Sequence, residues 1–272
     1  MAQTISSGAD HAVQPVRRRA PQLPWPLNLY QTAIGKKYAM ALTGIGLLGF
    51  VLVHMIGNLH LYEGPTEIHE YAEALRDLGG HLVPRTGVLW AMRIGLIAMF
   101  TIHVHAAWSL TRMSHKADQS YVAKRDYVAA NFASRTMRWT GPIILLYLLF
   151  HLADLTWGWL SDDWVRGDVY NNVYDSMEAL PVAILYMAAN VVLAIHIFHG
   201  AWSMFQTLGI NNPKYNGLRR NFARGIAGII LIGNLSFPLA VQTELIDLDG
   251  HTPGVYDIDE GDAIADHTEE QG

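Results

Sequence analysis

The sequence predicts an all-α integral membrane protein built as a bundle of five transmembrane helices. The first observation is composition, because 51% of the 272 residues are hydrophobic and only 16% are charged, whereas about 25% are charged in an ordinary soluble domain. The second is a set of long windows without Asp, Glu, Lys or Arg, at 38–62, 94–111, 139–153, 179–213 and 225–243. A bilayer core requires roughly 20 predominantly apolar residues. A soluble bundle of buried helices is the alternative, and windows of this length argue against it.

The five spans lie within a membrane domain over residues 30–242. The first span ends near Leu61, and three glycines between 44 and 49 allow close packing against its neighbours. The next three are expected at about 88–110, 139–160 and 181–208. The fifth, at about 225–241, is the weakest, because an asparagine, a serine and a proline interrupt it.

The segments outside the spans have distinct compositions. Residues 1–29 form an expected cytoplasmic N-terminal arm. The loop 62–87 contains a predicted amphipathic helix over 66–78, begun by a proline and stopped by two glycines. The loop 161–178 is acidic and rich in Tyr and Trp, which suit a membrane interface. The tail 243–272 has ten acidic residues and no Lys or Arg, and we expect it to be solvated and disordered outside the membrane.

The distribution of basic residues predicts the orientation. Five precede the first span, six lie in the loop 112–138 and four lie in 214–224, whereas the other side carries only Arg76, Arg85 and Arg166. Cytoplasmic loops hold the excess of Lys and Arg. We therefore expect a multi-pass protein of the inner (cytoplasmic) membrane, with its N-terminus in the cytoplasm and its C-terminus outside.

Four spans carry a histidine deep in an apolar segment, where an ionisable side chain is costly and usually functional. At about 1.5 Å per residue, His54 and His151 lie roughly 24 Å and 17 Å from the inner rim, in the outer half. His105 and His196, on spans that run inward, lie roughly 22–26 Å from the outer rim, in the inner half. Two layers of two histidines match the needs of two haem irons with two axial imidazoles each. The alternative for each is a histidine that packs and hydrogen bonds without ligating a metal, and four histidines in two matched layers favour ligation over it. The sequence therefore predicts a bundle that holds two haems b.

The ligand is open on two of these spans. His103 and His105 are about 200° apart around their helix, so only one of them can face the bundle axis. His196 and His199 are about 60° apart, so both could face it. A small residue four positions after a ligand would leave room for a flat ring, and this rule is met after His105, His196 and His199.

Two charged residues fall inside the predicted membrane region. Arg93 lies at about the level of the outer haem, and Asp154 lies one turn beyond His151. They could pair with each other, or Arg93 could neutralise a haem propionate. The alternative is that both snorkel to water. The absence of cysteine excludes covalent c-type haem and cysteine-ligated iron–sulfur clusters within this chain.

Four local patterns resemble the dihaem cytochrome b membrane anchor of succinate dehydrogenases and fumarate reductases, in its single-chain, five-helix form. The patterns are FVLVHMIGN, HAAWSLTR, TGPIILLYLLFHLADLT and HIFHGAWSMFQTLG, and they cover about residues 30–240. The resemblance implies that His54 and His151 ligate the outer haem and that His105 and His196, rather than His199, ligate the inner haem. The chain departs from some dihaem fumarate reductases at Ala194, where they carry a glutamate proposed for a proton path. Its acidic tail is also longer than the family would suggest.

The resemblance further implies that the chain carries electrons and performs no succinate oxidation itself. A flavoprotein subunit would oxidise succinate, and an iron–sulfur subunit docked on the basic cytoplasmic face would pass electrons to the inner haem. They would then reach the outer haem and a membrane quinone, expected to be menaquinone. The expected surroundings are lipid, quinone and these two subunits, with no nucleic acid; a higher oligomer of the complex is compatible with this arrangement.

Polar residues near the two rims are candidates for quinone binding. Those near the inner rim are Tyr30, Gln31, Lys36 and Lys37, and those near the outer haem are His60, Glu67, Glu70 and Arg93. Arg93 and His199 are also candidates for contacts with haem propionates.

Two other classes of protein share some of these features. The first is the dihaem cytochrome b anchor of a hydrogenase or a formate dehydrogenase, which would show a different ligand order and no HxxxG pattern in the fourth span. The second is a non-haem transporter or proton carrier that uses buried histidines, which predicts no haem absorption.

Overall fold

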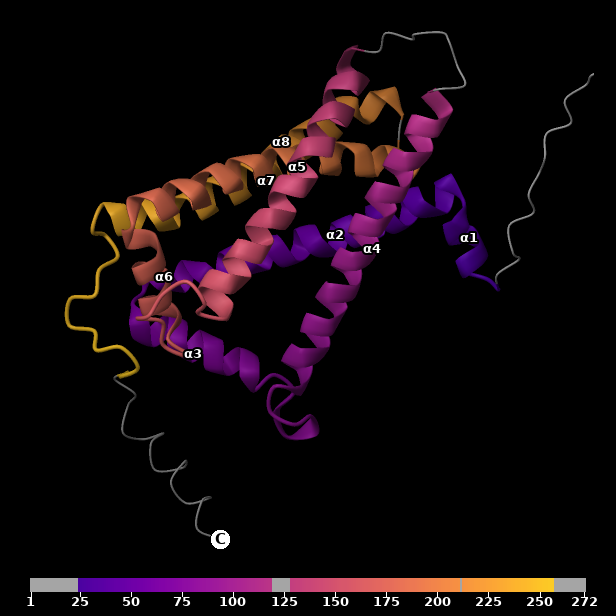
Figure 1. Ribbon diagram of the computed structural model, residues 1–272. Helices are drawn as coiled ribbons and strands as arrows, with labels where there is room; N and C mark the ends of the chain where they lie inside the picture. The colour runs from indigo at the N-terminus through magenta and orange to yellow at the C-terminus, as the bar shows by residue number, and fades with distance from the viewer. Residues whose placement is uncertain (1–23, 119–127, 211, 257–272) are drawn as a thin grey trace, which may run out of the picture.

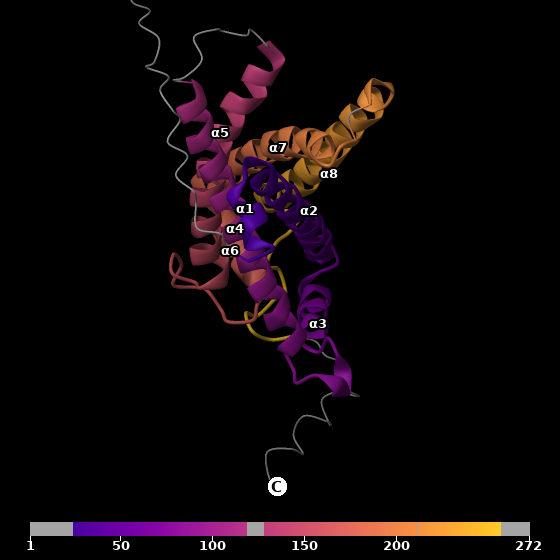
Figure 2. The same ribbon diagram turned by 90° about the vertical axis from the view of Figure 1, so that its right-hand side faces the viewer.

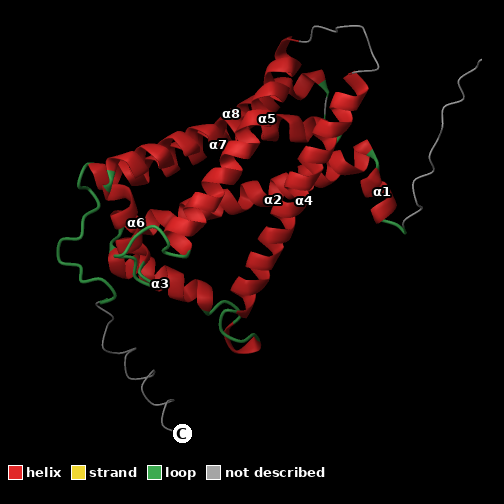
Figure 3. Cartoon of the chain, viewed as in Figure 1, coloured by secondary structure: helices red, strands yellow, loops and turns green. Residues whose placement is uncertain are grey.

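The computed structural model describes residues 24–118, 128–210 and 212–256, and within these ranges the chain is helical with connecting turns and no strand (Figures 1 and 3). The α-helices are α1 (Leu27–Gln31), α2 (Ala33–Asn58), α3 (Pro65–Arg76), α4 (Gly87–Asp118), α5 (Val128–His151), α6 (Val169–Glu178), α7 (Leu180–Thr207) and α8 (Asn216–Gln242). The shorter helical turns are η1 (Leu59–Tyr62), η2 (Gly80–Leu82), the π-helical η3 (Leu152–Thr156) and η4 (Pro213–Tyr215).

Five of these helices, α2, α4, α5, α7 and α8, are long and apolar enough to cross a membrane. They confirm the predicted all-helical class and the number of candidate spans. Successive long helices run in alternate directions, so α1 and η4 lie at one end of the bundle and α3 and α6 at the other (Figure 1). We call these ends the α1 side and the α6 side.

Glycines allow two pairs of long helices to approach closely. A Cβ atom added at Gly46 of α2 would collide with the Met99 sulfur of α4, and one added at Gly233 of α8 would collide with the Met55 sulfur of α2. A Cβ at Gly49 would meet nothing within 4 Å. The glycines of the first span therefore do serve close packing, as expected, but Gly49 does not take part.

The main apolar core lies at the α6 side. It joins α3, α6 and the end of α8 to the chain that follows α8, and its most buried members include Leu61, Ile68 and Ile246. A smaller cluster around Ile197 and Ile230 holds α7 to α8, which lie side by side along their length in both views (Figures 1 and 2).

The part of the bundle bordered by α2, α4, α5 and α7 is less filled. Along α4, Ala106 is the one buried residue among the side chains described between 87 and 115. Neither core cluster includes a fully buried residue of α4 or α5 among the described side chains. The bundle thus has a well-packed α6 side and a more sparsely packed middle.

Two features differ from the sequence-based expectation. The loop 161–178 contains a regular helix, α6, and its N-cap Asp168 accepts a hydrogen bond from the Asn171 amide. The acidic tail is not wholly solvated, because Ile246 is 1% exposed and residues 243–256 pack against the α6 side. The rest of that tail (257–272) and most of the expected N-terminal arm (1–23) lie outside the described residues.

Candidate functional site

The first histidine pair joins α2 to the end of α5. The ring centroids of His54 and His151 are 6.1 Å apart, with the ring planes at 84° to each other. Phe50 stacks on His54 at 5.4 Å, and Tyr147 and Tyr186 lie 5.9 Å and 6.0 Å from His151. We call it the α6-side pair, since Tyr147 and Tyr186 also belong to the α6-side core.

The second pair joins α4 to α7. The ring centroids of His103 and His196 are 6.4 Å apart, with the ring planes at 63°. Gly44 of α2 lies against the His103 ring, because a Cβ added there would be 3.4 Å from the His103 Cε1 atom. We call it the α1-side pair.

Both separations fit an iron ion held between two imidazoles. Such rings have centroids about 6.2–6.4 Å apart, because each metal–nitrogen bond is about 2.0–2.1 Å and each ring nitrogen lies about 1.1 Å from its ring centre. The observed distances are 6.1 Å and 6.4 Å. Each pair therefore has the spacing of the axial ligands of one haem.

The four histidines of the two pairs differ in their exposure. The His54 side chain is exposed, and those of His103, His151 and His196 are half-buried, although all four lie between helices. Gly200 lies one turn after His196, and a Cβ atom added there would meet nothing within 4 Å. The residues present thus fit the axial ligation of haem b, which His54 with His151 and His103 with His196 would hold.

The level of each pair follows from the helices. Thr43 and Thr140 contact the α1-side pair, and each precedes a histidine of the α6-side pair on its own helix by eleven residues. Eleven residues advance about 16 Å and turn about 1,100°, which is about 20° past three full turns. The two pairs therefore lie about 16 Å apart along the helix axes and face the same interior.

His105 does not join the α1-side pair. Its side chain is exposed, and its Nδ1 atom hydrogen bonds to the Tyr30 hydroxyl at 2.6 Å. The structure therefore brings His103, not the expected His105, to His196. The two positions point in nearly opposite directions from α4. Because α2 packs against the face of α4 that carries His103, His103 points into the bundle and His105 points away from it. The small-residue rule could not decide between them, because Ala107 follows His103 by four positions just as Ser109 follows His105.

The inner-rim candidates separate into two groups. Tyr30 stacks on His105 with ring centroids 5.7 Å apart. Lys36 is 9% exposed, and its ammonium group donates to the carbonyl oxygens of Tyr30 and Gln31 at 3.1 Å each. Lys36 therefore caps the end of α1 and ties Gln31 into that turn, while Lys37 is exposed.

The outer-rim candidates do not converge on one point. His60 stacks on Tyr71 at 4.7 Å, and its Nδ1 lies 2.7 Å from a Glu63 carboxylate oxygen. Glu67 and Glu70 are exposed on α3. These three candidates share a region of the α6 side without a common contact among the described residues.

Arg93 and Asp154, two charged residues inside the candidate spans, do not contact each other. Arg93 is exposed, and its guanidinium lies 5.1 Å from the centre of the Trp90 ring. Asp154 is 6% exposed and accepts hydrogen bonds from Ser176 at 2.5 Å and Tyr186 at 2.7 Å. The buried carboxylate thus finds its partners on α6 and α7, which sequence spacing alone did not indicate.

His199 remains beside the α1-side pair. It is half-buried one turn after His196, and its ring lies 5.2 Å from that of Phe198. Its predicted contact with a propionate stays a prediction.

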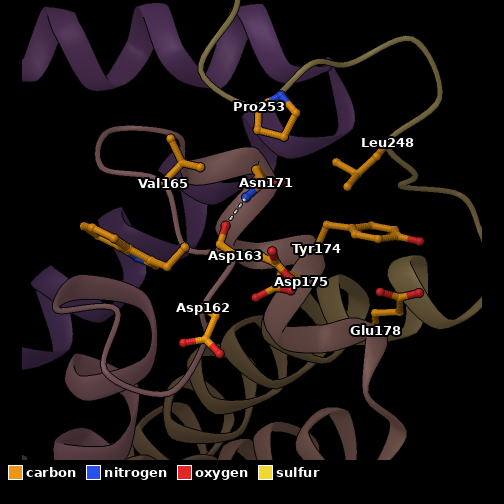
Figure 4. A pocket seen from close by; sticks show the side chains of 10 residues that line it. Asp162, Asp163, Val165, Asn171, Tyr174, Asp175, Glu178, Leu248 and Pro253 are labelled. Carbon is orange, nitrogen blue, oxygen red and sulfur yellow. Dashed lines mark hydrogen bonds between the residues drawn. The ribbon is translucent and has the colours of Figure 1, made fainter.

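A hollow on the α6 side has a different character. Its volume is about 500 Å³. Within it, the side-chain amide of Asn171 donates to the Asp163 carbonyl oxygen at 3.1 Å (Figure 4). Four carboxylates line it, from Asp162, Asp163, Asp175 and Glu178. None of the predicted site residues lies there, and the hollow is separate from both histidine pairs.

No group of three or more His, Asp or Glu side chains converges as a metal site within the described ranges; a haem iron takes only two protein ligands in a bis-histidine site. Comparisons of the chain with protein-family models, with curated proteins and with solved structures found no match.

Proposed function

We propose that the chain is a membrane cytochrome b that carries electrons between two haems, as the membrane-anchor subunit of a succinate:quinone oxidoreductase. The proposal is carried by one observation: four candidate membrane helices hold two histidine pairs, with ring centroids 6.1 Å and 6.4 Å apart. Ionisable side chains in such helices are rare and usually functional.

Two haem irons would each be held by one pair, His54 with His151 and His103 with His196. Bound haem b would supply one-electron chemistry by cycling between ferric and ferrous iron. The chain would hold the two imidazoles of each pair at a centroid spacing of 6.1 Å or 6.4 Å, place them between apolar helices, and separate the two levels by about 16 Å. This replaces His105 with His103 as the ligand from the second long helix.

Quinone would exchange electrons and protons near one rim of the bundle. On the α1 side, the Tyr30 hydroxyl and the His105 imidazole form a polar pair at 2.6 Å, held in place by the Lys36 cap on α1. On the α6 side, His60, Glu67 and Glu70 supply polar groups on η1 and α3. Each side thus has one directly bonded pair of proton-carrying side chains, Tyr30 with His105 at the α1 side and His60 with Glu63, 2.7 Å apart, at the α6 side.

The charge distribution supports the proposed partners. Fifteen of the 19 Lys and Arg residues fall in the sequence segments 1–37, 112–138 and 214–224. These segments include the starts of α2, α5 and α8 and the end of α4, which are the α1-side ends of those helices. An iron–sulfur subunit with a flavoprotein subunit would dock on this basic face, and electrons would enter at the α1-side haem. By the same distribution, the α1 side would face the cytoplasm and the acidic C-terminal segment the outside of the inner membrane.

The test is spectroscopic. The full-length protein is expressed with its host's haem supply, purified in mild detergent, and examined as a dithionite-reduced minus oxidised spectrum with a pyridine haemochrome assay. We expect a b-type α band and two haems per chain. A protein that binds no haem would overturn the proposal and favour the transporter class. Co-purification with a flavoprotein that oxidises succinate tests the anchor role; a hydrogenase or formate dehydrogenase partner would overturn that part alone.

A further inference from the structure

Each histidine of the α1-side pair is hydrogen bonded by a buried threonine on a neighbouring helix. The Thr140 hydroxyl of α5 lies 3.0 Å from the His196 Nδ1 atom. The Thr43 hydroxyl of α2 lies 3.3 Å from the His103 Nδ1 atom. The two threonines are 7% and 9% exposed, so water does not readily replace them.

The hydrogen atom of each hydroxyl is already used within its own helix. Thr43 donates to the Ala39 carbonyl oxygen at 2.7 Å, and Thr140 donates to the Thr136 carbonyl oxygen at 3.0 Å. A hydroxyl has one hydrogen and two acceptor lone pairs. With the hydroxyl hydrogens on these carbonyl oxygens, both threonines accept from the imidazoles, and the Nδ1 atoms of His103 and His196 carry the hydrogen.

We propose that Thr43 and Thr140 are positioning residues that hold His103 and His196 as Nδ1–H tautomers, keep both Nε2 atoms free to ligate iron, and lower the midpoint potential of the haem between them. The inference rests on the proposed function. A neutral imidazole protonated on one nitrogen binds metal through the other. An acceptor on the N–H makes the ligating nitrogen more basic, which stabilises ferric iron over ferrous iron.

The α6-side pair lacks the equivalent bond at one of its members. The His151 Nδ1 atom is buried without a hydrogen-bond partner among the described residues. Along α2 and α5, each threonine stands at the α1-side level and each histidine at the α6-side level, with the same spacing of eleven residues. Helices α2 and α5 thus each give a hydrogen-bond acceptor to the α1-side pair and a ligand to the α6-side pair. The effect of the threonines should therefore be confined to the α1-side haem.

The test compares Thr140→Val with Thr140→Ser. Valine matches threonine in shape but removes the acceptor, whereas serine keeps it. Redox titration of the two haems in the purified full-length protein measures both midpoint potentials. With valine, we expect the ferrous-to-ferric ratio of one haem to rise about tenfold at a fixed potential, equivalent to a shift of about 59 mV to more positive values. Serine should restore the original potential.

Thr43→Val is the second variant. We expect it to shift the midpoint potential of the same haem by a smaller amount, because the Thr43 bond is longer than the Thr140 bond. It also provides the test if Thr140→Val binds haem poorly. Thr111→Val is the matched control. Its hydroxyl makes the same bond to the Ala107 carbonyl oxygen, at 2.9 Å on α4, and meets no imidazole among the described residues. Electron paramagnetic resonance of the ferric haems reports the ligand field independently, and only the shifted haem should change its g values.

The outcomes separate this inference from the proposed function. If the wild-type protein carries no haem, the proposed function fails. If it carries two haems, and Thr140→Val and Thr43→Val leave both potentials equal to those of the Thr111→Val control, the threonine inference is wrong while the haem sites stand. A shift to more negative potentials, or equal shifts of both haems, would also overturn it.

Discussion

Replacement of Asp168 by alanine should release the C-terminal segment from the α6 side. Asp168 has a fully buried carboxylate that caps α6 and also holds the chain beyond α8. It accepts hydrogen bonds from the Asn171 amide, the His251 Nε2 atom and the Gly254 amide, each at 2.9 Å. Burial alone would raise the pKa of Asp168, but these donors outweigh burial and lower it. The carboxylate is therefore charged when it holds the segment.

The magnitude follows from the bonds that alanine removes. The two donors of the segment, on His251 and Gly254, lose their buried acceptor at about 1–1.5 kcal/mol each, the lower part of the usual range. The lost N-cap, about 1 kcal/mol, destabilises α6 itself and does not enter this sum. Local opening of residues 247–256 should therefore become easier by about 2–3 kcal/mol, which corresponds to an increase of about 30- to 150-fold in the open population. Most of α7 and α8 does not share these bonds and should keep its stability.

Amide hydrogen exchange of the detergent-solubilised protein measures this opening directly. Peptides that cover 247–256 should exchange faster by that factor, while peptides from the middle of α7 should not change. Asp162→Asn is the matched control, because it removes an exposed carboxylate from the same loop. Unchanged exchange of 247–256 in Asp168→Ala, or equal acceleration in the control, would refute the assignment of Asp168 as the anchor of this segment.

Three further perturbations test separate parts of the structure. The folded-state pKa of Asp168 lies below its ordinary value of 3.8, so its stabilisation is present above about pH 4 and is lost as pH falls through the folded pKa. The Gly254 amide resonance should therefore keep its position from pH 7 to 5 and shift below pH 4. A shift already complete at pH 6 would contradict this. Gly46→Val should lower the unfolding temperature through overpacking that costs about 1–3 kcal/mol, whereas Gly49→Val, a substitution into open space, should have little effect. Lys36→Met should increase exchange of the α1 amides by removing the cap on its carbonyl oxygens, while the exposed Lys37 offers a matched Lys37→Met control with no effect expected.

Much of the fold could be predicted from the sequence because membrane-length apolar windows are a strong signal. Charge-free runs located all five long helices, and proline and glycine marked the ends of α3. The depths of His54 and His151 were also accessible, because axial rise depends only on residue number. Their contact across α2 and α5 agrees with that estimate.

The choice between His103 and His105 was beyond the sequence rules. Axial rise separates the two by only about 3 Å, and both are followed by a small residue after four positions. Their difference is rotational, and rotation of α4 is set by the approach of α2 through Gly44 and Gly46. A rule that also sought buried hydroxyls at matching levels would have found Thr43 and Thr140.

The packed part of the acidic tail was missed for another reason. Its composition of many carboxylates and few apolar residues is typical of disorder. Ile246, His251 and the Gly254 amide nevertheless supply an apolar anchor and two donors that fit the α6 side and Asp168. Such a fit depends on a partner surface made by distant residues, which composition cannot represent.

The most direct test of the proposed ligands is the haem content of His103→Ala and His105→Ala, measured in parallel with the wild-type protein. The 6.4 Å separation of His103 from His196 predicts one haem per chain in His103→Ala. The Tyr30 bond of His105 predicts two haems per chain in His105→Ala, as in the wild type. The reverse pattern, or two haems in both variants, would contradict the account of the α1-side site.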